Sequence, residues 1–111
     1  MGILRAAEIT PHEIAPGRSR YEAHTDHLML VVVEFNDGPH TEADAPHSHP
    51  HEQVSYIVDG EVTFYLEGRP HHLIAGDMIT IPPNIPHTIQ VLTNNARLLD
   101  AFSPIREDFL K

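Results

Sequence analysis

The chain has 111 residues, a formal net charge of −9 and no cysteine. This length allows one core, and an apolar content of 41% suffices for a small barrel or sandwich. The lack of cysteine excludes disulfides and thiolate metal sites, and an acidic chain without a Lys/Arg cluster is a poor match for nucleic acid. The first ten residues show no cleavable leader and no long apolar run. We therefore expect a cytoplasmic protein that does not span a membrane.

Short β-branched, apolar segments recur along the chain and predict an all-β fold. Ten prolines and six glycines interrupt the longer segments and leave little room for helices. In chain order, the predicted strands are residues 28–35, 54–58, 62–66, 72–74, 78–81, 88–92 and 97–102. Many short strands at close spacing indicate a sandwich or barrel. We expect a single domain over residues 1–111, with its barrel over about 28–103.

Turn signals separate these strands. The dipeptide Asp59-Gly60 predicts a two-residue β-hairpin between the second and third strands. Two further turns are predicted at Glu67-Gly68-Arg69-Pro70 and at Ala75-Gly76-Asp77. The closing residues 107–111 are expected to form a short helical turn or to fray.

Three histidines and one side-chain amide lie within seven residues, in His47-Ser48-His49-Pro50-His51-Glu52-Gln53. Neutral imidazole is the commonest protein ligand for first-row metals. On a strand, alternate side chains face one side, so His47, His49 and Gln53 would point the same way. His87, which follows a proline-rich turn, would have to come from a neighbouring strand. We predict a divalent metal held by three imidazoles and one amide oxygen, with positions left open for substrate.

Other features of this cluster leave alternatives open. His51 shares the parity of the predicted ligands but follows Pro50, so we expect it beside a ligand or at the rim, with direct ligation as the alternative. The neutral amide of Gln53 leaves more positive charge on the ion, which favours oxygen-rich anionic substrates. Nickel, iron, manganese and zinc all suit such ligands. The remaining alternative is a core of hydrogen-bonded histidines without metal.

A second group of polar and aromatic side chains lies near the C-terminal end. Asp100 and Phe102 alternate on the last predicted strand and so face one side. A buried aspartate is costly unless it is paired or catalytic, and the planar fork of Arg106 suits a carboxylate. The simpler interpretation makes Phe102 a core residue and Asp100 a turn cap. It pairs Arg106 with Glu107 or Asp108 at the surface.

Two spaced motifs resemble those of the cupin superfamily. The first has His47-x-His49, three residues, Gln53, six residues and Gly60; the second has Gly76, five residues, Pro82, then Asn84 and His87. The resemblance implies a small antiparallel jelly-roll barrel. Gln53 stands where cupins usually carry glutamate, and Asn84 replaces a glycine. Asparagine tolerates the positive φ that such a turn needs.

Together with the Asp-x-Phe-x-x-x-Arg pattern of residues 100–106, these motifs resemble the KdgF family of pectin-degradation cupins. The resemblance implies that three histidines and a glutamine bind the metal, and that the aspartate, phenylalanine and arginine act on substrate. It implies conversion of 4,5-unsaturated monouronates from pectin or alginate to their linear keto form, in a homodimer. Other readings are an iron oxygenase, a non-catalytic carbohydrate-binding cupin and a metal-free barrel.

Overall fold

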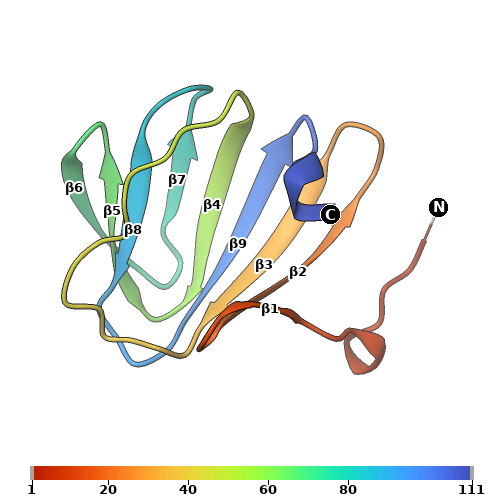
Figure 1. Cartoon of the computed structure of the whole chain (residues 1–111), viewed down its shortest axis with the longest axis horizontal. Coiled ribbons are helices and arrows are strands. Elements are labelled where there is room, and N and C mark those ends of the chain that lie inside the picture. Colours follow the sequence, from red (N-terminus) through yellow and green to blue (C-terminus); the bar gives the residue numbers. More distant parts are fainter. Residues whose placement is uncertain (1, 111) are drawn as a thin grey trace.

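Two antiparallel sheets make up the computed structural model, which describes residues 2–110 (Figure 1). The larger has the strand order β1-β2-β3-β9-β4-β7 and the smaller β6-β5-β8. Their bounds are β1 (His12–Ala15), β2 (Arg18–His24), β3 (Met29–Phe35), β4 (Glu52–Asp59), β5 (Glu61–Leu66), β6 (Arg69–Ile74), β7 (Met78–Ile81), β8 (His87–Val91) and β9 (Ala96–Ser103). Two 3-10 turns, η1 (Ala6–Glu8) and η2 (Glu107–Leu110), complete the described residues. The predicted all-β jelly-roll class is confirmed.

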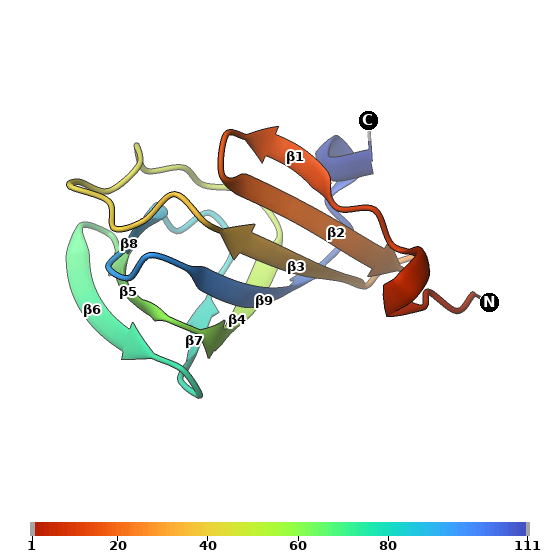
Figure 2. The same ribbon diagram turned by 90° about the horizontal axis from the view of Figure 1, so that it is seen from below.

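All seven predicted segments coincide with strands, from β3 to β9. The structure adds β1 and β2 at one edge of the larger sheet, beyond β3 (Figure 2). No strand was predicted there because the sequence of β2, RSRYEAH, has no alternating apolar face. Its strand conformation depends on a continuous antiparallel register with β3, from Arg18 opposite Phe35 to His24 opposite Met29.

The closing helical turn is confirmed as η2 for the part of the prediction within the described residues, and Lys111 lies outside them. Neither 3-10 turn within residues 2–110 approaches the length or apolar character that a membrane-crossing helix needs.

The hairpin predicted at Asp59-Gly60 is wrong. β4 pairs with β9 and β7, whereas β5 pairs with β6 and β8, so Gly60 carries the chain from one sheet to the other. Gly60 has a φ of +87°, and a Cβ there would lie 2.5 Å from the carbonyl oxygen of Asn95. The two-residue hairpin lies instead at Glu67-Gly68, between β5 and β6, where both residues have positive φ. Positive φ at both central positions is typical of a type I′ turn, which matches the twist of the paired strands.

Strand β4 shows why the core and the site lie at opposite ends of one barrel. Its alternation buries Gln53, Ser55 and Ile57 on the inner face and exposes the intervening side chains. Ile57 belongs to the main apolar core, which fills the space between the sheets. Gln53 and Ser55 instead face polar groups, so the inner surface changes from apolar to polar along this single strand.

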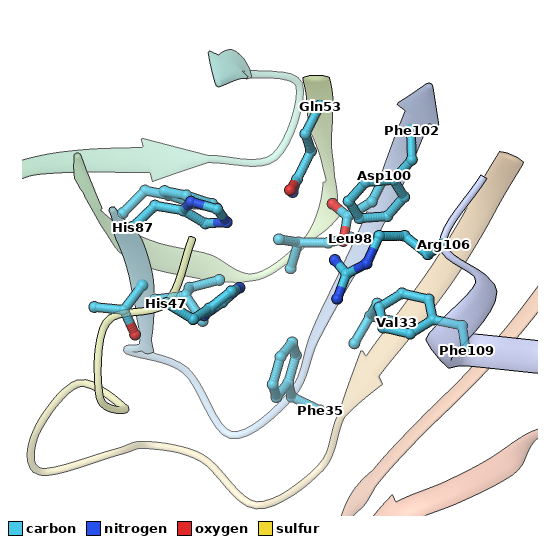
Figure 3. Close-up of a pocket in the computed structure, with 13 residues that line it drawn as sticks. Val33, Phe35, His47, Gln53, His87, Leu98, Asp100, Phe102, Arg106 and Phe109 are labelled. Atoms are coloured by element: carbon cyan, nitrogen blue, oxygen red, sulfur yellow. The ribbon is translucent and has the colours of Figure 1, made fainter. Parts of the chain in front are cut away.

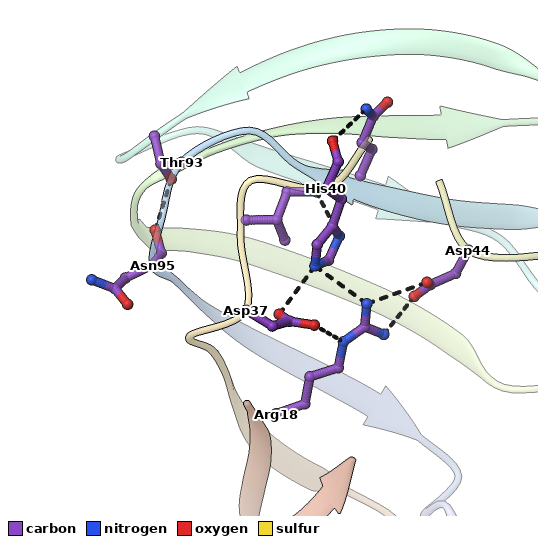
Figure 4. Close-up of polar contacts among 8 residues, drawn as sticks. Arg18, Asp37, His40, Asp44, Thr93 and Asn95 are labelled. Atoms are coloured by element: carbon purple, nitrogen blue, oxygen red, sulfur yellow. Dashed lines mark hydrogen bonds and ion pairs between the residues drawn. The ribbon is translucent and has the colours of Figure 1, made fainter. Parts of the chain in front are cut away.

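A network of ion pairs ties β2 to the connector between β3 and β4 (Figure 4). Arg18 contacts Asp37 at 2.9 Å and Asp44 at 2.7 Å, and the Nε2 atom of His40 lies 3.0 Å from Asp37. Burial by itself would raise the pKa of Asp37, but hydrogen bonds from His40 and Arg18 outweigh it and lower that pKa. The network holds the connector, which continues to His47, against the larger sheet.

Arg18→Gln should lower the free energy of unfolding by about 1 kcal/mol at pH 7, because both ion pairs are partly exposed. Because the pKa of Asp37 is lower in the folded state, its ionised carboxylate stabilises the fold at pH values above the ordinary carboxylate pKa. This stabilisation is lost as pH falls through the folded-state pKa. The difference between wild type and variant should therefore shrink at pH 3. Urea unfolding at the two pH values measures it, and an unchanged difference would contradict the prediction.

Candidate metal centre and substrate cavity

Residues from both sheets meet at the polar end of the barrel. His87 begins β8, and His47 pairs with it in an isolated β-bridge with backbone hydrogen bonds of 3.0 and 2.9 Å. His49 follows in the connector, and Gln53 comes from β4 in the facing sheet. The candidate ligand atoms of His47, His49 and His87 lie within 4.8 Å of one another. The structure thus brings the four predicted metal ligands together, and Figure 3 shows three of them, His47, Gln53 and His87.

These residues converge in a different way from the one predicted. His47 and His49 do not lie on a continuous strand, because β4 begins at Glu52 after a bend at Pro50. The β-bridge to His87 holds one end of this segment. At the other end, the backbone N–H of Asn84 donates to the backbone carbonyl oxygen of His49 at 2.8 Å. Asn84 has a φ of +65°, as predicted for its place in the turn.

Backbone carbonyls fix the proton on two of the imidazoles. Nδ1 of His49 donates to the carbonyl oxygen of His51 at 3.0 Å, and Nδ1 of His87 donates to that of Ile85 at 2.8 Å. Each Nε2 therefore presents a lone pair towards the site. Burial lowers the pKa of His47, His49 and His87, and the positive charge of Arg106 lowers each further. All three are neutral imidazoles at neutral pH, the form that binds metals.

Two observations indicate that a cation fits among these side chains. Nε2 of His87 is buried without a hydrogen-bond partner among residues 2–110. Nε2 of His49 lies 3.0 Å from Oε1 of Gln53, although each atom offers a lone pair. Two ligands at right angles, each about 2.1 Å from one ion, lie about 3 Å apart. The residues present fit a divalent metal.

His51 lies beside this group rather than within it. Its ring packs edge-on against that of His49, with 5.4 Å between the centroids. The geometric cluster of candidate ligands contains the other three histidines. The expected role next to a ligand stays a prediction, and so does the alternative of direct ligation, because Nδ1 of His51, like Nε2 of His87, is buried without a hydrogen-bond partner among the described residues.

Three of the candidate ligands, His47, Gln53 and His87, line a cavity of about 280 Å³. Ligand pockets usually start at about 300 Å³, so this volume suits a single sugar ring rather than an oligosaccharide. Asp100 and Arg106 lie across the cavity from His47 and His87, as Figure 3 shows. The full lining is Val33, Phe35, His47, Gln53, Phe64, His87, Thr88, Ile89, Leu98, Asp100, Phe102, Arg106 and Phe109.

Asp100 is held in the middle of β9, directly opposite Ser55 of β4. The Ser55 hydroxyl donates to Oδ1 of Asp100 at 2.6 Å. Burial raises the pKa of Asp100 from 3.8 to about 6, although the hydrogen bond from Ser55, the charge of Arg106 and a hydrogen bond from Gln53 all lower it. Asp100 caps no turn, so that part of the simpler interpretation is wrong. A carboxyl that titrates near neutrality is suited to general acid and base catalysis.

The structure bears out the core position of Phe102 and the pairing of Arg106 with Asp108, but the Arg106 side chain is only 12% exposed and does not lie at the surface. Phe102 is 3% exposed and packs in the core with Met29 and Val31. Arg106 makes two hydrogen bonds to Asp108, through Nε at 3.0 Å and Nη2 at 2.9 Å. Its guanidinium also stacks on Phe102 and on Phe109, 5.2 and 4.2 Å from the ring centroids. Both predicted site residues nevertheless line the cavity, so their structural contacts fix them beside it.

Sequence reasoning missed Ser55 and Phe109. Ser55 is fully buried, and the available signal was a polar residue at an inward position of a predicted strand, two residues after Gln53. Phe109 lies in η2, and no pattern in so short a turn indicates which way its side chain faces.

Comparison with known proteins agrees with this architecture. Residues 32–102 match the family model described as cupin domain. The pectin degradation protein KdgF of Dickeya dadantii (strain 3937) is 36% identical over 87 residues, covering 78% of this chain and 76% of that protein. The structure of KdgF from Halomonas sp. has a TM-score of 0.88 at 32% identity and covers 98% of both chains. An RmlC-like cupin from Shewanella frigidimarina NCIMB 400 has a TM-score of 0.87 at 33% identity, covering 98% of this chain and 96% of that one. The chain therefore belongs to the cupin domain family and, within it, is similar to KdgF.

Proposed function

We propose that this protein is a metal-dependent enzyme that converts 4,5-unsaturated monouronates to their linear keto form by ring opening and tautomerisation. The observation that carries the proposal is the placement of Asp100, whose carboxyl shares a cavity that suits one sugar ring with His47 and His87 of the three-histidine cluster. The similarity to pectin degradation proteins supports a sugar acid as the substrate class.

The chemistry of this isomerisation needs proton movement and no oxidant. Ring opening removes the proton of the anomeric hydroxyl and breaks the bond between the anomeric carbon and the ring oxygen. Tautomerisation then adds a proton to a carbon of the former double bond. A single carboxyl that accepts one proton and returns another serves both steps, and we assign this role to Asp100. A divalent metal bound by His47, His49, Gln53 and His87 would supply Lewis acidity towards substrate oxygens.

The arginine and the phenylalanine would orient the sugar acid. Arg106 brings positive charge to the cavity wall, and its bonds to Asp108 hold the guanidinium in one orientation. We assign it to the substrate carboxylate, which a guanidinium binds with well-defined geometry. Phe102 lies between Arg106 and His49 and would pack against the sugar ring. Asp108 would share the guanidinium with the substrate.

Incubation with unsaturated galacturonate tests the proposal directly. We expect the ultraviolet absorbance of the 4,5-double bond to decline faster than in buffer alone, without oxygen consumption. Prior treatment with a chelator should abolish the acceleration, and added divalent metal should restore it. Substrate-dependent oxygen uptake would indicate an oxygenase instead, and binding without a loss of absorbance would indicate a carbohydrate-binding protein.

The outer face of the larger sheet supports the proposal that two copies pair. Val54, Tyr56 and Val58 of β4 face outward and are 37–44% exposed, and Met78 of the adjacent β7 is 67% exposed. Leu30 of β3 extends this uncharged strip beyond β9. We propose a homodimer through this face; the cytoplasmic location expected from the sequence stays a prediction.

Tyr56→Lys should shift the protein from dimer to monomer in size-exclusion chromatography with light scattering. It places a charge in the middle of the strip, and stable interfaces bury about 800 Å² of largely uncharged surface on each partner. Ile14→Lys is the matched control, because Ile14 is similarly exposed but lies on β1. A monomeric wild type, or a dimer unaffected by Tyr56→Lys, would overturn this interface.

A further inference from the structure

A chain of two hydrogen bonds joins a candidate metal ligand to the proposed acid and base. Nε2 of Gln53 lies 2.9 Å from Oγ of Ser55, and that oxygen lies 2.6 Å from Oδ1 of Asp100. Gln53 and Ser55 are two residues apart on the inner face of β4, and Asp100 lies opposite Ser55 on β9. Gln53 and Ser55 are 6% and 0% exposed, so water does not compete for these bonds.

The direction of both bonds follows from how many protons each group has. A carboxylate only accepts, so the single hydroxyl proton of Ser55 points to Asp100. Oγ of Ser55 must then accept from its other neighbour, and the NH₂ of an amide is the group that can donate to it. This turns Oε1 of Gln53 towards His49. A carboxylate at position 53 would compete with Asp100 for the same proton and leave one buried acceptor unpaired.

We propose that Ser55 is a positioning residue that, together with Asp100, requires an amide at position 53 and aims its oxygen at the metal. The inference rests on the proposed function only in treating Asp100 as a working carboxylate. It accounts for glutamine where the cupin motif usually has glutamate: the amide donates to Ser55, whereas a glutamate would need Ser55 to donate to it.

Reversing the direction of the two hydrogen bonds, from Gln53 to Ser55 and from Ser55 to Asp100, tests this inference. The readout is protein stability, so no substrate is needed. Gln53→Glu should increase the unfolding equilibrium constant of the chelator-treated protein about tenfold at pH 8, as expected for neighbours in one hydrogen-bond network. In an Asp100→Asn background the same substitution should cost much less stability, because the new amide can donate to Ser55, which then donates to Glu. Urea unfolding of both single variants and the double variant measures the coupling.

Charge repulsion between two carboxylates would also be relieved by Asp100→Asn, so the same cycle is repeated with Ser55→Ala. We expect the reduction in the cost of Gln53→Glu to disappear in that background, since no hydroxyl remains to reverse. A reduction of equal size with and without Ser55 would overturn the inference in favour of simple repulsion. If Gln53→Glu alone does not fold, the inference requires that the double variant fold and that the triple variant with Ser55→Ala not fold; any other outcome counts against it.

A second measurement uses metal affinity to report on the orientation of the Gln53 side-chain amide. Ser55→Ala removes the hydroxyl to which the Gln53 amide donates, so the affinity for Co²⁺, titrated by visible absorption, should fall about 10-fold or more, as when other partners of metal ligands are lost. Ser103→Ala is the matched control, because its hydroxyl bonds the carbonyl of His27 outside the cavity. Unchanged Co²⁺ affinity in Ser55→Ala would overturn the inference. If these results hold but no uronate is converted, the proposed substrate fails and the role of Ser55 stands.

Discussion

Asp100→Asn is expected to lower kcat on unsaturated galacturonate by about 10²–10⁴-fold, the usual contribution of a well-placed general acid or base. The variant has nearly the same shape, and its carbonyl oxygen can still accept the Ser55 hydroxyl. It cannot exchange a proton near neutral pH. Metal content should stay at the wild-type level, because Asp100 is not among the candidate ligands. Steady-state kinetics and elemental analysis of the same preparation measure both effects.

The pH profile separates catalysis from a structural effect of this substitution. With the pKa of Asp100 raised to about 6, kcat of the wild type should fall on the acid side of that value if the ionised form accepts the first proton. The residual activity of Asp100→Asn should lack this limb. Asp26→Asn serves as the control, because Asp26 is an exposed aspartate in a turn outside the main cavity. Near-wild-type turnover in Asp100→Asn would rule out the assigned role.

Stability should change in the opposite direction from activity. The native state binds the Asp100 proton more tightly than the unfolded chain, so stability is lost as pH rises from about 4 to beyond 6. The rise in the pKa of Asp100 from 3.8 to about 6 corresponds to a loss of at most about 3 kcal/mol of unfolding free energy at pH 8. Asp100→Asn removes this cost, and the variant should be more stable than wild type at pH 8 but not at pH 4.

The fold was largely predictable because its strands carry local signals. β-branched residues with period-two alternation mark β4 and β5, and glycine-containing turns bound them. β2 carries no such signal, since its strand conformation comes from pairing with β3. The mistaken hairpin at Gly60 has a similar origin: the same dipeptide suits a hairpin and a passage between sheets, and only the pairing of distant strands decides.

Some residues of the candidate site also carry a local sequence signal, whereas others are placed only by the pairing of distant strands. The candidate ligands could be predicted because residues that are close in the sequence are also close in the structure. His47 and His49 are two residues apart, and a turn in which Asn84 has positive φ leads to His87. The role of Ser55 could not be predicted, because it depends on the register that sets Ser55 opposite Asp100, 45 residues later. The pairing of Arg106 with Asp108 was foreseen as an alternative, but its stacking on two aromatic rings was not.

His49→Ala should remove metal and activity together. His49 is 7% exposed, its Nε2 lies 3.0 Å from the amide oxygen of Gln53, and its ring centroid lies 6.0 and 4.9 Å from those of His47 and His87. Loss of a residue that merely orients a ligand lowers metal affinity by about 10–100-fold, so loss of a ligand should exceed about 100-fold. Dialysed protein should therefore contain almost no metal by elemental analysis, and its turnover of unsaturated galacturonate should fall to background.

His71→Ala is the matched control, because His71 is an exposed histidine on β6 without a hydrogen-bonded side chain among the described residues. It should keep both metal and turnover. A His49→Ala protein that is folded, metal-replete and active would contradict the ligand assignment. One that retains metal but loses activity would place His49 in contact with substrate instead. The two measurements must be made on one preparation, because only their joint loss distinguishes a ligand from a neighbour of the substrate.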